Sequence, residues 1–373
     1  MDCAKGGKRR RLTNQLSRMS KPLRTSLTAN LIATLAAALA LTYVRAAEQQ
    51  AATLKDEVAK YPAVNYTDAS PHKSAFADVN GIKINYLDWG GDGPPLVMIH
   101  GIGDDPHVFD DLAMLLRDQF RIVAYARRGH GLSDSTGPYD GNTLVEDLRQ
   151  LLDKLGIQRT RLIGWSMGGN EITAFAGRYP ERVEKLVYLE SGYDWSTPSF
   201  FKPVEGMFAL ESPGAADVQS IDTIRKWYRL AWLGSNVTWS PGLESYLRDL
   251  AQPDAKGNLH PKPTDEASAA LLATVGNWQR DYTKVKAPAL AVYATTFFPT
   301  ERSDPALVRK IVDFDQNIMV PFRRESMERI QRELRNVKVK QIADRTHMAI
   351  GVQDPKPLAA TIKEFLLASV EKE

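Results

Sequence analysis

The feature that most constrains this chain is a Gly-x-Ser-x-Gly sequence, Gly164 to Gly168, set between a short apolar segment and a helical pattern. Residues 160–163 have the length and composition of a strand, and residues 170–179 repeat apolar side chains at helical spacing. In a tight strand-to-helix turn, side chains at the glycine positions would collide with neighbouring backbone. The arrangement predicts that Ser166 is lifted clear of a sheet as a nucleophile. Because such a short pattern also occurs by chance, its sequence context has to support it.

Apolar segments of strand length alternate with helical patterns on both sides of this turn. Helical spacing recurs at 108–116 and 143–155. Apolar strands that alternate with amphipathic helices indicate a mostly parallel sheet with helices on both faces, an α/β fold. Ligands bind such sheets beyond the carboxyl ends of the strands, where we expect His100, Arg127, Ser166 and Glu190. The predicted strands are 94–99, 121–125, 160–163, 184–189, 287–294 and 337–342.

Three motifs together resemble those of the α/β-hydrolase superfamily, and within it the serine esterases and perhydrolases. His100-Gly101 follows the first long strand, Arg-Gly-His-Gly-Leu-Ser-Asp (128–134) follows the next, and the Gly-Trp-Ser-Met-Gly-Gly turn (164–169) comes third. Their order and spacing are those of the family. The resemblance extends from about Phe76 to the C-terminus and implies the α/β-hydrolase fold with a helical cap insertion.

A serine hydroxyl becomes an effective nucleophile when a histidine takes its proton and a carboxylate orients that histidine. In this fold the chain order is serine, acid, histidine. Among six histidines, only His347 follows the last predicted strand, where the family carries its base. We therefore expect Ser166 to be the nucleophile and His347 the general base.

The sequence leaves alternatives for the acid. In most relatives an aspartate follows the strand that here ends at Ala294, but residues 295–300 hold no carboxylate. A subset of the family takes its acid from the end of the strand after the elbow helix, where Glu190 follows four apolar residues. A carboxylate there would be partly desolvated, and a histidine cation is a suitable partner for it. The prediction favours Glu190, and the alternatives are Glu301, Asp304 and Asp194.

Two further groups of residues are expected near the serine. The resemblance implies an oxyanion hole made by the backbone N–H groups of Met167, at a helix N-terminus, and Ile102, in the loop after His100-Gly101. His100 and Arg127 are interpreted as residues that hold loops in place rather than as catalysts.

The reaction expected from this site is acyl transfer. Relatives that open epoxides or remove halide have an aspartate at the elbow, so Ser166 argues against both reactions. The leading prediction is an enzyme that hydrolyses small-molecule carboxylic esters through an acyl-enzyme, with neither a cofactor nor a metal. The alternative is a cofactor-free perhydrolase or carbon–carbon bond hydrolase on the same triad. A second alternative, a non-catalytic binding protein on a hydrolase fold, is supported only by the missing aspartate.

The long insert between two predicted strands, residues 193–284, is expected to form a helical cap over the site, with helices at 221–233 and 243–250. An aromatic-rich roof would suit a bulky apolar substrate group, whereas the same residues could simply pack the cap onto the body. A later helical pattern, 320–335, has many charged residues, Arg323 among them, and predicts a solvated face. The tryptophans of the insert are Trp195, Trp227, Trp232, Trp239 and Trp278.

Residues 1–46 are predicted to form a basic leader with an apolar signal or anchor segment. A linker over 47–75 and a catalytic domain over 76–373 are predicted to follow. Residues 1–24 contain eight of the basic side chains, and the rest of the chain holds 40 basic and 44 acidic ones. Basicity therefore belongs to the leader, and no nucleic-acid partner is indicated. The leader predicts export, periplasmic or secreted, with cleavage near Ala46. The alternative is an uncleaved N-terminal membrane anchor.

Overall fold

The structure is a computed structural model that describes residues 60–369. The predicted leader (1–46) and most of the predicted linker (47–75) lie outside the described residues, so the export and anchor predictions stay predictions. Over residues 60–369, no helix combines the length and the apolar character needed to cross a bilayer.

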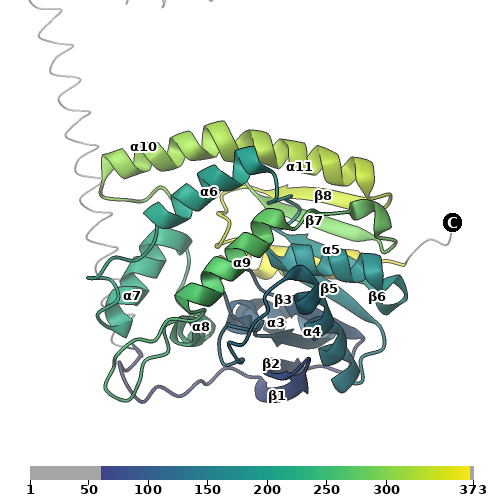
Figure 1. The fold of residues 1–373 in the computed structure, drawn as a ribbon, viewed down its shortest axis with the longest axis horizontal. Coiled ribbons are helices and arrows are strands. Elements are labelled where there is room, and N and C mark those ends of the chain that lie inside the picture. The colour runs from purple at the N-terminus through teal and green to yellow at the C-terminus, as the bar shows by residue number, and fades with distance from the viewer. Residues whose placement is uncertain (1–59, 370–373) are drawn as a thin grey trace, which may run out of the picture. The chain divides into compact units, whose positions relative to one another are not determined.

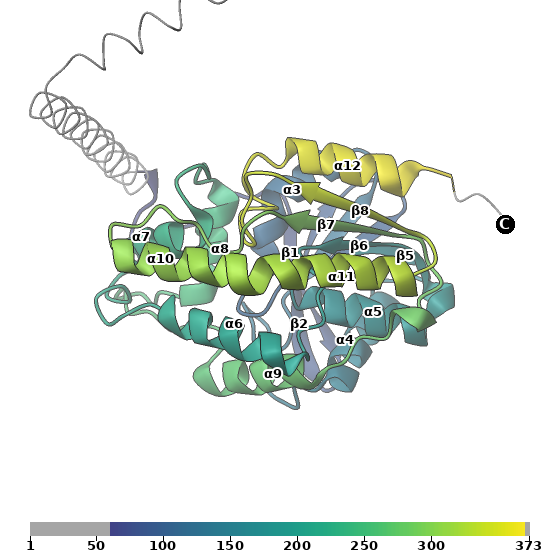
Figure 2. The ribbon, with the colours of Figure 1, turned by 90° about the horizontal axis from the view of Figure 1, so that it is seen from above.

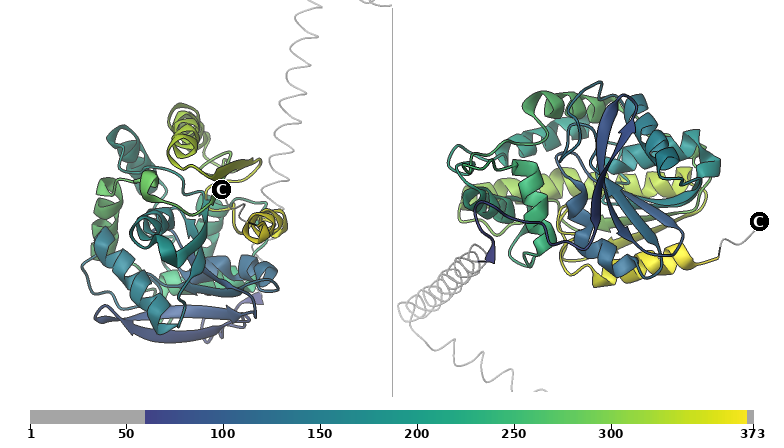
Figure 3. Two further views of the ribbon diagram at one scale, coloured as in Figure 1. Left: turned by 90° about the vertical axis from the view of Figure 1, so that its right-hand side faces the viewer. Right: turned by 90° about the horizontal axis from the view of Figure 1, so that it is seen from below.

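An eight-stranded, mostly parallel sheet forms the centre of the molecule (Figures 1 and 3). The strand order is β1-β2-β4-β3-β5-β6-β7-β8; β1 and β2 form an antiparallel hairpin, β2 is antiparallel to β4, and all other neighbours are parallel. The sequence-based prediction of an α/β fold with a mostly parallel sheet is confirmed. The strands are β1 (Lys73–Val79), β2 (Ile82–Gly90), β3 (Pro95–Ile99), β4 (Arg121–Tyr125), β5 (Thr160–Trp165), β6 (Val183–Leu189), β7 (Ala289–Ala294) and β8 (Val337–Ile342).

Alternation along the central strands explains why helices cover both faces. Successive side chains of a strand point to opposite faces, so Val97 and Ile99 of β3 belong to one apolar cluster and Leu96 and Met98 to another. The first cluster includes apolar residues of α4 (Gly141–Lys154) and α5 (Gly168–Arg178). The second includes those of α3 (Asp110–Leu116) and α12 (Lys356–Leu367). Figure 2 shows these two helix pairs on opposite sides of the strands.

The insert between β6 and β7 is helical. A long helical rod follows β7 and runs past the insert, as Figure 2 shows. The insert contains α6 (Pro198–Leu210), α7 (Ile221–Tyr228), the π-helical turn η3 (Arg229–Leu233), α8 (Pro241–Ala251), α9 (Asp265–Asn277) and the short turn η4 (Tyr282–Lys284). The rod consists of α10 (Pro305–Phe314), the π-helical turn η5 (Asp315–Met319) and α11 (Val320–Glu333).

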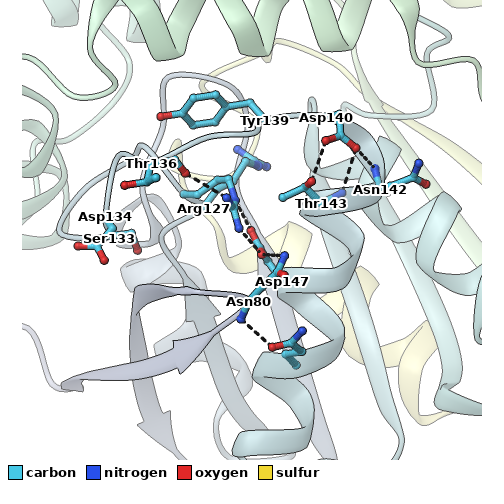
Figure 4. A network of polar contacts seen from close by, with 12 residues as sticks. Asn80, Arg127, Ser133, Asp134, Thr136, Tyr139, Asp140, Asn142, Thr143 and Asp147 are labelled. Carbon is cyan, nitrogen blue, oxygen red and sulfur yellow. Dashed lines mark hydrogen bonds and ion pairs between the residues drawn. The ribbon is translucent and has the colours of Figure 1, made fainter.

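The loop after β4 is fixed to helix α4 by a buried ion pair. Both carboxylate oxygens of Asp147 accept hydrogen bonds of 2.6 Å from Arg128. Asn80 donates to the same carboxylate at 2.8 Å (Figure 4). Arg128 also donates to the Thr136 carbonyl at 3.0 Å. Asp140 caps the start of α4 by accepting from the backbone N–H of Asn142 at 2.9 Å. Removing one partner of a buried, hydrogen-bonded pair leaves an uncompensated charge, so this network holds the loop at the carboxyl edge of the sheet.

Candidate active site

Ser166 lies in the turn between β5 and α5, at a left-handed backbone conformation with φ +50°. Such a conformation is strained for a residue with a side chain and is characteristic of functional turns. The turn is also tight, because a Cβ on Gly168 would lie 2.3 Å from the Ile99 carbonyl oxygen of β3. Ser166 retains 8% exposure. The local geometry is therefore the strand, sharp turn and helix that the sequence predicts.

Glu190 and His347 meet in a buried contact. Glu190 is the first residue after β6, and its Oε2 lies 2.8 Å from His347 Nδ1. The other oxygen, Oε1, accepts hydrogen bonds from the Ala294 backbone N–H at 2.6 Å and from the Tyr193 hydroxyl at 3.0 Å. Neither residue exceeds 2% exposure. A carboxylate held in this way would orient the imidazole ring and stabilise its cation.

A buried arginine, Arg323, is linked to Glu190 through the Tyr193 hydroxyl. Arg323 Nε donates to the Tyr193 hydroxyl at 3.1 Å, and its Nη1 donates to the Thr295 carbonyl at 3.0 Å. The prediction that Arg323 belongs to a solvated helix face is wrong, since it is 2% exposed. Most of the helix composition is charged, and composition alone could not show that Arg323 turns toward the loops after β6 and β7.

The His347 ring is fixed by aromatic neighbours. It stacks on Phe297 with ring centroids 4.4 Å apart and an interplanar angle of 15°. The backbone N–H of His347 donates to the Phe297 carbonyl at 3.1 Å, and its own carbonyl accepts from Trp165 Nε1 at 3.2 Å. Trp165 directly precedes Ser166, so the loop that carries the histidine is tied to the strand that carries the serine.

The other three carboxylates considered from the sequence are engaged elsewhere. Asp194 pairs with Arg329 and with Ser196. Asp304 is exposed and caps the start of α10, accepting from the Ala306 backbone N–H at 2.8 Å. Glu301 is also exposed. Of the four candidates, the structure brings Glu190 to His347.

Ser166 and His347 line the same cavity, which has a volume of about 350 Å³. Two of the five tryptophans of the insert, Trp227 and Trp232, line it as well, whereas Trp195 and Trp239 are buried in the packing of the insert. Two of the tryptophans therefore border the cavity and two serve packing, and contact with a bulky substrate group stays a prediction. The apolar wall consists of Ile102, Phe208, Pro213, Trp227, Trp232, Leu250, Pro263, Leu272 and Met348.

The loop after β3 closes against the serine. A Cβ on Gly101 would lie 3.1 Å from Ser166 Cβ and 2.3 Å from Asp104 Oδ2, so only glycine fits there. Ile102 follows and lines the cavity, and Met167 is the N-cap of α5. The two residues predicted to form the oxyanion hole are thus both near Ser166. Ile102 lines the same cavity, and Met167 is the next residue in the chain.

Asp104 is a cavity residue that the sequence reasoning missed. Its carboxylate accepts a hydrogen bond of 2.6 Å from the Tyr246 hydroxyl, which in turn contacts the Tyr228 hydroxyl at 2.8 Å. Burial raises the pKa of Asp104 to about 6 against the opposing effects of Tyr246, His347 and Arg127. The sequence did contain a signal for Asp104. It follows His100-Gly101 by three residues, in a loop that was already expected to border Ser166.

His100 and Arg127 form the buried frame of this edge. His100 Nε2 accepts from the Arg127 backbone N–H at 3.0 Å, and the Arg127 guanidinium donates to the carbonyls of His100 and Gly101 at 2.7 and 3.0 Å. Arg127 Nε also donates to Glu171 at 2.6 Å. Neither His100 nor Arg127 is a cavity-lining residue, and these contacts hold the loop after β3 against the loop after β4.

A second cluster of ionisable groups lies apart from the cavity lining. Within residues 60–369, the one group of His, Cys, Asp and Glu side chains placed to hold a metal ion is Asp68, His72 and His107. None of the three lines the cavity with Ser166.

Comparison with known proteins identifies the family. Residues 94–352 match the model of the alpha/beta hydrolase fold family, and the chain belongs to that family. It is 40% identical over 111 residues to a putative non-heme chloroperoxidase of Synechocystis sp., covering 29% of this chain and 40% of that protein. It is 32% identical over 150 residues to 2-(acetamidomethylene)succinate hydrolase of Mesorhizobium japonicum, covering 40% of this chain and 51% of that protein.

A solved structure has the same fold over most of the chain. The crystal structure of E-2-(acetamidomethylene)succinate hydrolase aligns with a TM-score of 0.59 at 22% identity, covering 80% of this chain and 100% of that one. The curated relatives are matched over about half of their own length or less. The fold and the family therefore follow from these matches, and the reaction and its substrate are matters for proposal.

Proposed function

We propose that this protein is a serine hydrolase that cleaves carboxylic esters through an acyl-enzyme, with Ser166 as nucleophile, His347 as general base and Glu190 as the orienting acid. The observation that carries the proposal is the buried 2.8 Å contact of Glu190 Oε2 with His347 Nδ1, beside a cavity that His347 shares with Ser166. Glu190 would thus serve as the orienting carboxylate in place of the aspartate that most relatives carry after the strand ending at Ala294. The contact of Glu190 with His347 argues against the binding-protein alternative, which rested only on the missing aspartate.

The proposed reaction has two halves. His347 Nε2 takes the proton of the Ser166 hydroxyl as its oxygen attacks the ester carbonyl carbon, and Glu190 stabilises the imidazole cation. The backbone N–H groups of Ile102 and Met167 would hold the oxyanion. As the tetrahedral intermediate collapses, His347 gives the proton to the departing alcohol, which leaves an acyl-Ser166. Water, deprotonated by His347, then releases the carboxylic acid and restores the serine.

The cavity favours an ester with one apolar group of moderate size. Its wall is mostly aliphatic and aromatic, and its volume of about 350 Å³ is at the low end for small-molecule sites. Asp104 and Glu211 add acidic groups to the lining. A free carboxylate on the substrate next to ionised Asp104 would be repelled, so neutral esters are the expected class.

A perhydrolase is the second candidate, favoured by the similarity to a putative non-heme chloroperoxidase over 111 residues. In that reaction hydrogen peroxide replaces water as the attacking nucleophile on the acyl-enzyme, and a peracid is released in place of the carboxylic acid. The same serine, histidine and carboxylate serve both reactions. The two candidates therefore differ in the second half-reaction alone.

The deciding experiment combines labelling with a substrate panel. A fluorophosphonate should modify Ser166, located by mass spectrometry, and p-nitrophenyl esters of increasing acyl length should be hydrolysed. Ser166→Ala should abolish both, while Ser235→Ala, at an exposed serine, should change neither. A folded sample that is not labelled would disprove the serine mechanism. Labelling of Ser166 together with peroxide-dependent halogenation and negligible ester hydrolysis would replace the esterase by the perhydrolase.

A further inference from the structure

A cluster of imidazole and carboxylate groups joins three distant parts of the chain. Asp68 and His72 precede β1, His107 lies in the short helical turn η1 (Pro106–Phe109), and Asp249 lies in α8. α8 packs against η1 and against α3, which begins at Asp110. In Figure 1, α8 lies next to α3.

The donor atoms of this cluster converge on one point. Asp68 Oδ2, His72 Nε2 and His107 Nε2 all lie within 4.8 Å of one another. Asp68 Oδ2 is 3.1 Å from His72 Nε2 and 4.0 Å from His107 Nε2, and Asp249 Oδ2 is 3.8 Å from His107 Nε2. Ligand atoms at the corners of a zinc tetrahedron are separated by roughly 3.3 Å, given bonds of about 2.0–2.2 Å. The separations among Asp68, His72 and His107 are compatible with this value, and Asp249, whose contact in the cluster is with His107, would have to move closer to complete the shell.

His72 provides an independent indication. Its side chain is 3% exposed; its Nε2 lies 3.1 Å from Asp68 Oδ2 but outside hydrogen-bonding geometry, and its Nδ1 has no hydrogen-bond partner among the described residues. The ring packs against Trp89 and His107, with centroids 5.4 and 4.9 Å apart. A buried polar group without a partner is destabilising. A cation bound between His72 Nε2 and Asp68 Oδ2 would replace this poorly directed contact and would be bound by both groups.

His107 is oriented in the manner of a metal ligand. Its Nδ1 lies 2.8 Å from Asp110 Oδ2, and the other oxygen of Asp110 accepts from Trp89 Nε1 at 2.9 Å. Metal-bound histidines usually donate their second ring N–H to a carboxylate, which fixes the tautomer and the direction of the free nitrogen. Here that arrangement directs Nε2 of His107 toward Asp68 and Asp249.

The cluster also carries more acidic than basic groups. Asp68, Asp105, Asp110 and Asp249 surround two imidazole rings, those of His72 and His107, and Asp105 Oδ2 has no hydrogen-bond partner among the described residues. A divalent cation would stabilise these carboxylates in their charged form. The competing interpretation is that a protonated His107 alone balances them.

We propose that Asp68, His72, His107 and Asp249 bind a divalent transition-metal ion, with Zn²⁺ as the best match to two imidazole nitrogens and two carboxylate oxygens. The site is distinct from the proposed catalytic groups and does not depend on the reaction that they perform. Its role would be structural, because the ion would tie the segment before β1 and helix α8 to η1.

The position of α8 gives such a tie a consequence for the cavity. Tyr246 and Leu250 of α8 line the cavity, and Tyr66 of the preceding segment hydrogen-bonds Ser245 of the same helix at 2.9 Å. Removal of the ion should therefore loosen one cavity wall as well as the segment that leads into the sheet.

The test uses the full chain, purified with a tag that contains no histidine. Chelator-treated protein is titrated with ZnCl₂ alone, the bound metal is measured by mass spectrometry after desalting, and thermal unfolding is followed by circular dichroism. A single zinc ion per chain should be retained, and its addition should raise the melting temperature. His72→Ala and Asp249→Asn should each lower the zinc content to near zero while keeping the folded spectrum, and His260→Ala, whose side chain is 64% exposed, should retain it.

Two results would overturn the site. One is a folded wild-type protein that retains no zinc and shows no change in melting temperature. The other is equal zinc retention by wild type, His72→Ala and Asp249→Asn. Because His72 lies in the irregular segment before β1 and outside the central sheet, its replacement tests the ligand set even where Asp249→Asn fails to fold. None of these readouts uses ester hydrolysis, so failure of the proposed function would not be confused with failure of the metal site.

Discussion

The molecule contains two buried pairs of histidine and carboxylate with the same central contact. His347 Nδ1 lies 2.8 Å from Glu190, and His107 Nδ1 lies 2.8 Å from Asp110. In both pairs the carboxylate also accepts a hydrogen bond from a second donor, the Ala294 backbone N–H in one and Trp89 in the other. The difference is in what lies near the other ring nitrogen. His347 borders a cavity shared with Ser166, whereas His107 Nε2 has Asp68 and Asp249 within 4.0 Å.

The comparison shows that the pair alone does not define a function. A carboxylate at Nδ1 orients an imidazole ring equally well for proton transfer and for metal binding. A hydroxyl next to an apolar cavity suits the first use, and further anionic ligands suit the second. Each prediction below changes one residue at either pair or in the loop between them. Each tests whether proton transfer at His347 and metal binding at His107 can be altered independently.

The largest effect is expected from Glu190→Gln. The amide keeps the shape of the side chain but removes its charge and presents a donor to His347 Nδ1, which favours the wrong tautomer. Loss of the orienting carboxylate in serine hydrolases lowers kcat by about 10⁴, so we expect a decrease of roughly 10³ to 10⁴ in ester hydrolysis. Glu301→Gln, at an exposed carboxylate, is the matched control. Equal turnover by Glu190→Gln and wild type would assign the acid elsewhere.

The first pair could be predicted from sequence and the second could not, for a physical reason. Ser166, Glu190 and His347 each follow an apolar strand whose place in the sheet can be inferred, and the carboxyl ends of parallel strands meet at one edge. Even so, four carboxylates remained open, because the choice depends on how the loops after β6 and β7 fold. The proposed ligands of the second cluster come from the segment before β1, the turn η1 and helix α8, so no spacing along the chain indicates that they meet, and no metal was expected. The hairpin β1–β2 and the burial of Arg323 were missed for similar reasons.

The second prediction concerns Asp104, which lies in the loop between the two clusters. Its pKa is raised from 3.8 to about 6, so the native state holds this proton at pH values where the unfolded chain has released it. The free energy of unfolding of the wild type should therefore fall as the pH rises from 4 toward 7, by about 3 kcal/mol from this group. Asp104→Asn lacks this titration. Its stability relative to wild type should increase over that range by a similar amount, measured by urea unfolding at several pH values.

The difference between the two proteins isolates Asp104, since all other titrating groups are common to both. A constant difference from pH 4 to pH 8 would contradict a raised pKa for this carboxyl. If the stability of Asp104→Asn relative to wild type instead increases as the pH falls, the charged carboxylate is stabilised in the folded protein and its pKa is lowered.

Asp110→Asn should have a smaller effect, confined to the metal. Loss of the carboxylate behind a metal-bound histidine typically weakens metal affinity by about 10- to 100-fold. We expect a decrease of that size in zinc affinity, measured by competition with a chelating dye. Asp118→Asn, at a carboxylate that follows the C-terminal end of α3 and pairs with Lys363 of α12, is the control. Unchanged affinity in Asp110→Asn would mean that the contact with His107 does not serve a metal ligand.

The smallest effect is expected from Tyr193→Phe. Tyr193 is fully buried and does not line the cavity, and its hydroxyl joins Glu190 to Arg323. Removing the hydroxyl leaves Glu190 with the Ala294 N–H and His347, so the acid should be held less firmly. A hydrogen bond of this kind contributes about 1 kcal/mol, which corresponds to a decrease in kcat of roughly fivefold with little change in KM. Tyr282→Phe removes another buried hydroxyl that contacts an arginine, Arg280, away from Glu190, and should leave kcat unchanged. If both variants lose stability and kcat to the same extent, Tyr193 acts only in packing; a decrease in kcat specific to Tyr193→Phe makes it a positioning residue for the proposed acid.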